Sequence, residues 1–137
     1  MLFLISCSCK DTANEKVSSL LLIQIDLRTQ QIADPTSERL EIMKEMGMRV
    51  DNLEIHRIFI YLNKEPSQTQ VMELEAIGIT VYLDSWIPPV GDYPTGFLLA
   101  DMPINKLDDL ASKSYVIRLD TAERVLEPNN GNQPQSG

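Results

Sequence analysis

The chain has 137 residues, of which 43% are hydrophobic, enough for one domain with a buried core and too few for two ordinary domains. Its formal net charge is −8, from 20 acidic and 12 basic residues, and the Lys and Arg residues are scattered along the sequence. Because nucleic-acid binding needs clustered positive charge, this distribution argues against a nucleic-acid partner.

The N-terminus carries both cysteines, Cys7 and Cys9, behind the apolar run Met1–Ser6. The four residues ending at Cys7, Leu-Ile-Ser-Cys, resemble the lipobox of prokaryotic lipoprotein signals, in which the cysteine becomes lipidated. The resemblance implies an extracytoplasmic protein, lipid-anchored at the cell surface through Cys7. The apolar run is shorter than the roughly 7–15 residues of a usual signal. The alternative is therefore a frayed N-terminus with two free thiols. We assign residues 1–16 to a signal-like or tether segment.

No metal or other cofactor is expected. Two thiols and the single distant histidine, His56, are too few for a closed four-ligand site, and no cysteine pairs occur in the predicted core to form a disulfide framework.

Residues 17–50 are interpreted as a helical extension. Between positions 17 and 32 the apolar residues fit both an alternating strand and one face of a helix, and helix is preferred because strands further along the chain already complete a sheet. A second helix is expected to begin with Asp34 as N-cap and Pro35 at its first position, and to end at Gly47.

A strand, a helix and a second strand are expected next. Leu53–Leu62 alternates in the manner of a strand. Ser67 and Gln70 have the spacing of a capping box, so a helix is expected to begin there and to stop at Gly78. Residues 79–84 alternate again, and the Pro- and Gly-rich stretch 85–94 predicts an irregular turn.

The remaining elements are a strand, a helix and a strand. Thr95–Met102 is the strand, Asn105 is the expected N-cap of a helix, and Tyr115–Leu119 is the last strand. The order strand, helix, strand, strand, helix, strand predicts an α+β fold, a ferredoxin-like split βαββαβ sandwich over residues 51–127. Residues 128–137 are polar and are expected to be a disordered tail.

Residues 58–122 resemble the propeptide-type inhibitor domain of subtilisin-like serine proteases. The matching stretches are Glu73–Ile79, Gly96–Pro103 with the following Leu107, Leu110 and Ala111, and Tyr115–Asp120. The resemblance implies a ferredoxin-like fold whose open sheet face docks on a protease. It also implies that the segment after Leu119, polar enough to be extended and solvent-reachable, runs through the protease's active-site cleft, with Leu126 as the apolar side chain near its end.

We expect no catalytic residue and no enzymatic activity. His56 has no evident nucleophile beside it, and the neighbours Asp108 and Asp109 do not face one another on a helix. The sequence contains no Gly-rich phosphate loop and no Gly-x-Ser-x-Gly motif.

Partner binding is predicted on the open sheet face. Aromatic and arginine residues are enriched at binding hot spots. By alternation, the helix-facing residues are Ile58, Ile60, Val81 and Ile117, and their neighbours on the open face are Phe59, Tyr61, Tyr82 and Arg118. The candidate partner-binding residues are Phe59, Tyr61, Tyr82, Trp86, Arg118 and Leu126. The alternative is that the helices of residues 17–47 cover this face.

The sequence thus predicts a non-enzymatic protein-binding module, an inhibitor or chaperone of a subtilisin-like serine protease. The alternative function is a structural or small-ligand-sensing ferredoxin-like domain of a surface lipoprotein with no protease partner.

Overall fold

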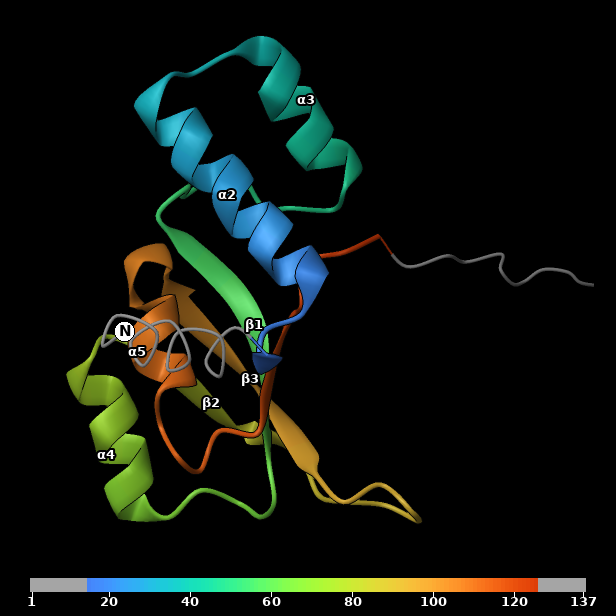
Figure 1. The fold of residues 1–137 in the computed structure, drawn as a ribbon, viewed down its shortest axis with the longest axis vertical. Helices are drawn as coiled ribbons and strands as arrows, with labels where there is room; N and C mark the ends of the chain where they lie inside the picture. Colours follow the sequence, from blue (N-terminus) through green and yellow to red (C-terminus); the bar gives the residue numbers. More distant parts are fainter. Residues whose placement is uncertain (1–14, 126–137) are drawn as a thin grey trace, which may run out of the picture.

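A four-stranded antiparallel sheet organises residues 15–125, the part of the chain that the computed structural model describes (Figure 1). The fold is α+β, as predicted. Its elements in chain order are α2 (Ser19–Ala33), α3 (Ser37–Glu45), β1 (Ile55–Leu62), α4 (Gln68–Ala76), β2 (Thr80–Ile87), β3 (Gly96–Pro103), the 3₁₀ helix η1 (Ile104–Lys106), α5 (Leu107–Ala111) and β4 (Arg118–Thr121).

The strand order across the sheet is β2-β3-β1-β4. Strand β1 is therefore central, and it pairs with β3 along its whole length, from Ile55 opposite Pro103 to Leu62 opposite Gly96. On its other side β1 pairs with β4, where Ile58 lies opposite Thr121. Both neighbours of β1 lie far from it in sequence, so the sheet is held together by long-range pairing.

One face of the sheet carries the hydrophobic core, covered by α4 and α5 (Figure 1). Alternate residues of the two central strands point into it, as the period of two requires. The buried strand residues are Ile58, Ile60 and Leu62 of β1 and Leu98, Ala100 and Met102 of β3. Leu74 of α4 and Leu110 of α5 close the core from the helical side, and Leu21 of α2 joins it at one edge. The predicted inward face of β1 is confirmed.

Two local predictions of helix are confirmed. Residues 19–33 form a helix, with the Ser18 side chain accepting a hydrogen bond from the Leu21 N–H at its N-terminus. In α4 the Ser67 hydroxyl accepts from the Gln70 N–H, while the Gln70 side chain accepts from the Ser67 N–H. Gly78 follows with a φ of +98°, the left-handed conformation that lets the chain leave a helix directly into a strand.

Three predicted element boundaries are wrong. Asp34 is not an N-cap. It is the C-cap of α2, where its N–H donates to the Gln30 carbonyl, and the N-cap of α3 is Thr36, whose hydroxyl accepts from the Arg39 N–H. Asn105 lies inside η1 and does not cap α5, whose N-cap residue is Lys106. The last strand is β4 (Arg118–Thr121), displaced from the predicted 115–119. In each case the predicted boundary residue lies within a few positions of the observed one. Residue type alone did not locate the boundary, because the backbone hydrogen bonds determine where an element begins.

The stretch predicted as an irregular turn begins with strand. Ser85, Trp86 and Ile87 belong to β2, and Ile87 pairs with Phe97 across a shift in the β2–β3 register. The Ser85 hydroxyl donates to the Tyr82 carbonyl and accepts from the Leu99 N–H, so it replaces backbone pairing where the register shifts. The prolines that suggested a turn, Pro88 and Pro89, stop the strand only after Ile87.

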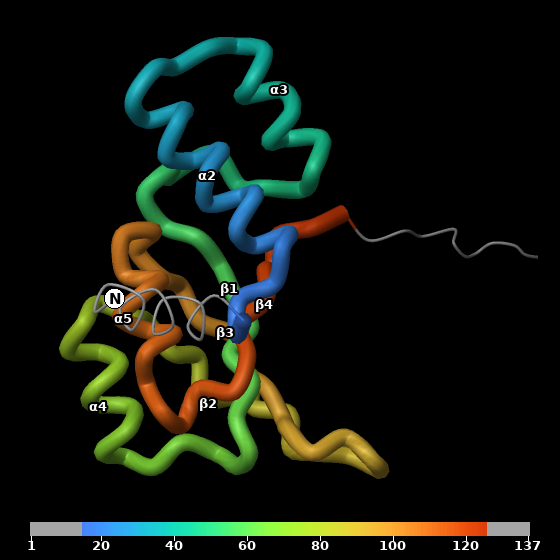
Figure 2. The backbone as a smooth tube through the Cα atoms, viewed as in Figure 1, coloured from blue at the N-terminus to red at the C-terminus, as the bar shows by residue number. Residues whose placement is uncertain are grey.

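The chain before α2 pairs with the outer edge of β4, where Figure 2 shows the two segments side by side. The Leu119 N–H donates to the Lys16 carbonyl (2.8 Å), and the Ser18 N–H donates to the Leu119 carbonyl (3.0 Å). Residues 16–18 therefore provide hydrogen-bond partners for the backbone N–H and carbonyl of Leu119, which lie on the outer edge of β4.

Within residues 15–125, none of the helices combines the length and apolar character needed to cross a bilayer.

Candidate functional site

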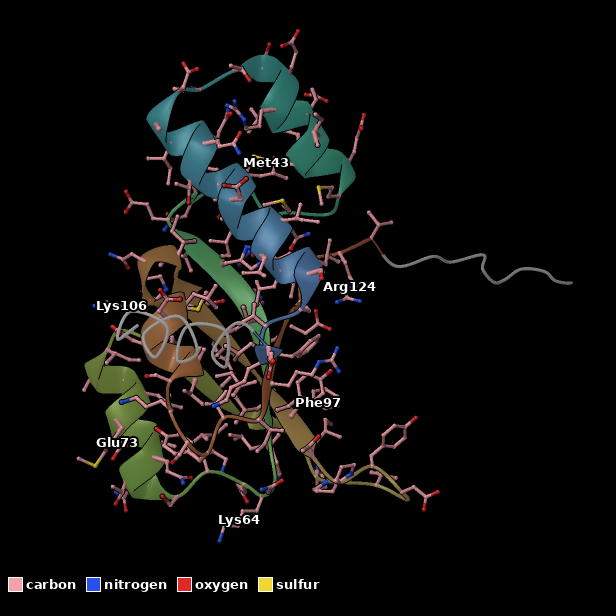
Figure 3. The ribbon with its side chains drawn as sticks, in the orientation of Figure 1. Met43, Lys64, Glu73, Phe97, Lys106 and Arg124 are labelled. Atoms are coloured by element: carbon pink, nitrogen blue, oxygen red, sulfur yellow. The ribbon has the colours of Figure 1, made fainter. Side chains whose placement is uncertain are left out.

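The face of the sheet opposite α4 and α5 carries a row of aromatic side chains. Phe97 of β3 lies between two residues of β1: its ring is 5.3 Å from Phe59 in an edge-to-face arrangement and 5.3 Å from Tyr61 in a tilted one. All three are partly exposed, and Figure 3 shows Phe97 on the side of the sheet away from α4. We call Phe59, Tyr61 and Phe97 the aromatic row. Its rings hold one another in place, which makes it a preorganised apolar contact surface.

An arginine lies at one end of the aromatic row. The guanidinium carbon of Arg118 is 5.2 Å from the centre of the Tyr61 ring, within the range of a cation–π contact. The side chain of Arg118 remains 54% exposed. The row is thus flanked by a positive group that is open to solvent.

A polar cluster lies toward the other end of the same face. Arg57 binds the Asp101 carboxylate with both Nε (2.8 Å) and Nη2 (3.2 Å), and the Tyr82 hydroxyl donates to the same carboxylate (2.6 Å). Partial burial alone would raise the pKa of Asp101, but the hydrogen bonds from Arg57 and Tyr82 together outweigh burial and hold that pKa below its usual range. The hydrogen bond to Asp101 is also the main reason why the pKa values of Arg57 and Tyr82 are raised. At neutral pH, Arg57 and Asp101 are therefore charged, and Tyr82 keeps the hydroxyl proton that it donates to Asp101.

Four of the predicted partner-binding residues share this face: Phe59, Tyr61, Tyr82 and Arg118. The structure brings Arg118 to Tyr61, and Tyr82 to the separate cluster around Asp101. Ile117, predicted to face the helices, is instead 40% exposed, because Val116 fills the buried position beside it.

Trp86 lies on the other side of the sheet. Its ring packs against the hydrophobic core and covers the backbone of Gly96, where a Cβ atom would be 2.7 Å from the ring. Trp86 is therefore not part of the surface that carries Phe59 and Tyr61. Leu126 and Cys7 fall outside the described residues.

Sequence reasoning missed Phe97, Leu99, Arg57 and Asp101. All four occupy outward positions of β1 and β3. The alternation that selected Phe59 and Tyr61 also predicts Arg57, and the same alternation along β3 predicts Phe97, Leu99 and Asp101, so the signal for these residues was present in the sequence.

The helical extension does not cover the aromatic row. Helix α2 turns Gln24 and Arg28 toward His56, which belongs to the buried, helix-facing side of β1. The expected alternative, a face hidden under residues 17–47, is therefore wrong for the described part of the chain. The docking of α2 on the helical side keeps the opposite face open.

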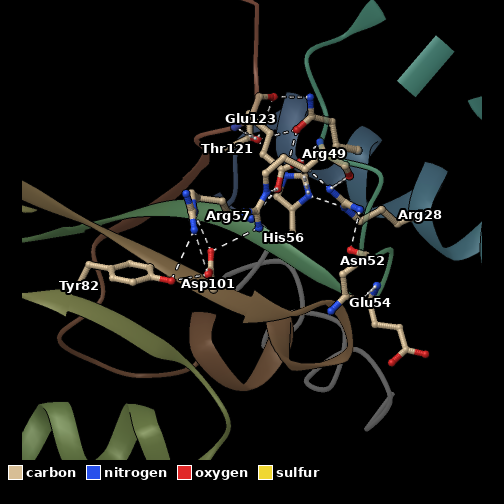
Figure 4. A network of polar contacts seen from close by, with 11 residues as sticks. Arg28, Arg49, Asn52, Glu54, His56, Arg57, Tyr82, Asp101, Thr121 and Glu123 are labelled. Carbon is tan, nitrogen blue, oxygen red and sulfur yellow. Dashed lines mark hydrogen bonds and ion pairs between the residues drawn. The ribbon is translucent and has the colours of Figure 1, made fainter. Parts of the chain in front are cut away.

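The C-terminal segment is anchored by a buried glutamate, Glu123 (Figure 4). Its carboxylate accepts hydrogen bonds from the Arg28 guanidinium, from the Arg49 N–H (3.0 Å) and from the Arg57 N–H (2.8 Å). Its own carbonyl accepts from the Gln24 side chain (2.8 Å). The expectation that the segment after Leu119 is solvent-reachable is thus wrong for Thr121 and Glu123, which are buried because Glu123 neutralises a buried arginine.

His56 is a member of this network and is fully buried. Its Nδ1 accepts a hydrogen bond from Arg28 Nε (2.7 Å), so the ring proton resides on Nε2, which lies 2.9 Å from the Thr121 hydroxyl and 3.1 Å from the Gln24 amide oxygen. Burial lowers the pKa of His56 to about 4, and the nearby positive charges of Arg28 and Arg49 add to this against the opposing effect of Glu123. The imidazole is neutral and has both nitrogens occupied, which leaves it no role as an external base.

Within residues 15–125, His, Cys, Asp and Glu side chains form no group of three or more placed to hold a metal ion. Comparison with known proteins gives no match: no family model, no curated protein and no solved structure matches the chain.

We predict that His56 makes the fold acid-sensitive. Its pKa is about 4 in the folded protein, against 6.5 for an unperturbed histidine, so between these pH values the unfolded chain binds a proton that the folded protein does not. The effect is absent above pH 6.5, and stability is lost as pH falls toward 4, by about 3 kcal/mol in all. Urea unfolding of wild type and His56→Gln at pH 7 and pH 4.5 measures it.

Gln retains an amide acceptor for Arg28 and a donor for Thr121 but does not titrate, so the variant should lose less stability on acidification than wild type. Equal losses in the two proteins would contradict the assignment of the acid sensitivity to His56.

Proposed function

We propose that residues 51–127 form a ferredoxin-like split βαββαβ domain with a helical extension at 17–50. The support is the strand order β4-β1-β3-β2, all antiparallel, with the two connecting helices α4 and α5 on the same face. In this arrangement each helix crosses from one strand to the next on one side only, which leaves the second face without helical cover.

We further propose that the chain is a non-enzymatic protein-binding module that docks through the aromatic row. The observation that carries this proposal is the uncovered aromatic row, in which Phe97 contacts both Phe59 and Tyr61, with Arg118 at its end. Aromatic and arginine side chains dominate the binding energy of protein interfaces, because they bury much area with few rotatable bonds to order. A buried, fully hydrogen-bonded His56 is consistent with a non-catalytic role.

The concrete form that we propose is an inhibitor or chaperone of a subtilisin-like serine protease. The resemblance over residues 58–122 motivates this partner, and the open face provides the surface that such a partner needs. Arg124 and Val125, beyond the Glu123 anchor, are exposed, so any segment that enters a protease cleft must begin after Glu123. An extended segment of this kind binds through main-chain hydrogen bonds to strand edges of the protease.

The alternative, a structural or small-ligand-sensing domain with no protease partner, is favoured by one observation. A cavity of about 500 Å³ opens beside the aromatic row, and its volume falls in the usual range of small-molecule sites.

We predict that Tyr61→Ala weakens protease binding by about 30-fold, the effect of losing a hot-spot residue of about 2 kcal/mol. Inhibition constants against a panel of subtilisin-like proteases measure this. The matched control is Met72→Ala on α4, which removes a side chain that is 62% exposed on the helical side and should leave inhibition unchanged. Wild-type protein that inhibits no protease of the panel at micromolar concentration would refute the proposed partner.

We predict that the chain ending at Val125 stays folded but loses inhibition, because it keeps the Glu123 anchor and lacks the segment that would enter the cleft. A chain ending at Asp120 should unfold, since loss of Glu123 leaves Arg28 as an unpaired buried charge, at a cost of about 3–5 kcal/mol. Circular dichroism and inhibition assays separate the two effects. Full inhibition by the chain ending at Val125 would eliminate the cleft-binding segment from the mechanism.

We also propose an extracytoplasmic location with a lipid anchor at Cys7, on the strength of the lipobox resemblance. Expression in a bacterial host followed by membrane fractionation tests it: wild type should be found with membranes and Cys7→Ser should be released. Wild-type protein found only in the soluble fraction would contradict the anchor.

A further inference from the structure

Exposed apolar side chains gather where the β2–β3 turn meets the start of β4. Four of the large hydrophobic residues that the described chain exposes lie here, namely Ile87 (45%), Val90 (63%), Tyr93 (76%) and Ile117 (40%). Exposed apolar groups scattered singly are ordinary, but a group of four around one hollow indicates a binding surface.

These residues line the 500 Å³ cavity introduced above. Tyr61 and Phe97 of the aromatic row contribute to the same cavity, whose other wall comes from the turn with Val90 and Tyr93. The aromatic contacts of Tyr61 with Phe97 and with Arg118 fix this side of the cavity. The cavity therefore has one wall on the rigid sheet and one on an exposed turn.

Arg118 is the one charged residue among those that line the cavity. Its side chain makes a single hydrogen bond within residues 15–125, and that one is long, 3.5 Å from Nη2 to Asp120 Oδ2. The Asp120 carboxylate accepts shorter hydrogen bonds from two other residues, the Ser18 hydroxyl (2.7 Å) and the Arg124 guanidinium (2.9 Å). Most of the donor capacity of the Arg118 guanidinium thus remains for a ligand, while the Tyr61 ring holds the group beside the apolar cavity.

We propose that this cavity binds a small amphipathic carboxylate, with an aromatic or aliphatic body between Val90 and Phe97 and its carboxylate on Arg118. An apolar lining with one convergent charged group is the common composition of such sites, and guanidinium matches a carboxylate in a two-pronged geometry. A monoanion suits the site better than a phosphate dianion, because a single guanidinium faces the cavity and the Asp120 carboxylate lies close to it.

The experiment uses the full chain and 4-phenylbutyrate, an aryl ring joined to a carboxylate by a short chain, with 4-phenylbutanamide as its uncharged counterpart. Titration followed by ¹H–¹⁵N correlation spectra should shift the amides of Val90, Tyr93 and Ile117. For a ligand of this size we expect a dissociation constant on the order of 1 mM. The amide should bind about tenfold more weakly, since it lacks the charge-assisted hydrogen bonds.

Variants assign the two halves of the ligand. Arg118→Gln should weaken 4-phenylbutyrate about tenfold and leave the amide unchanged, whereas Arg118→Lys should restore part of the difference. Val90→Ser should weaken both ligands, because it removes apolar wall at an exposed position that the fold does not need. Lys44→Gln, a loss of one positive charge on α3, is the control and should change neither affinity.

Three outcomes would overturn the proposal. The first is no shift of the cavity amides at about 10 mM 4-phenylbutyrate, tenfold above the expected dissociation constant. The second is equal affinity of acid and amide, which would remove Arg118 from recognition. The third is a shift of the same amides with protein concentration alone, which would make a second copy of the chain the occupant.

Discussion

The buried ion pair between Arg28 and Glu123 is the contact on which the rest of the molecule depends. It joins α2 to the segment after β4, 95 residues apart in sequence, and both side chains are almost completely removed from water. A buried pair of this kind adds little net stability over an apolar contact of the same shape, but breaking one half costs about 3–5 kcal/mol. Because either charge would be buried without a partner if the other were displaced, the pair couples the positions of α2, the sheet and the C-terminal segment.

The position of α2 explains why one face of the sheet stays open. Because Arg28 reaches both Glu123 and the His56 ring, α2 lies at the helix-facing side of β1 and packs against β4 and η1, while α3 packs against α2. Gly47, after α3, meets the backbone of Arg124 and Val125 so closely that a Cβ atom would be 2.6 Å from it. The same arrangement thus fixes the backbone of Arg124 and Val125 against the domain.

The parts of the fold that local chemistry determines could be predicted from the sequence. The period-two alternation of β1 and the capping box of Ser67 and Gln70 depend on neighbouring residues alone. The buried network could not be predicted, because an Arg and a Glu in the sequence are ordinarily solvated, and only the three-dimensional approach of α2 to β4 makes them partners. The Pro- and Gly-rich pattern puts Trp86 in an irregular turn, whereas it belongs to β2 past the register shift near Ser85, which no local pattern marks, and its ring packs against the core.

The two proposed binding sites share residues, so they cannot be independent. Tyr61, Phe97 and Arg118 belong to the surface proposed for a protein partner, and they also line the cavity proposed for a carboxylate. A partner that covers the aromatic row must either leave Arg118 free or place an acidic group of its own on it, because burying an unpaired guanidinium would cost more than the apolar contact returns. If the partner places an acidic group on Arg118, a small carboxylate competes directly with that partner, since both then need the same guanidinium.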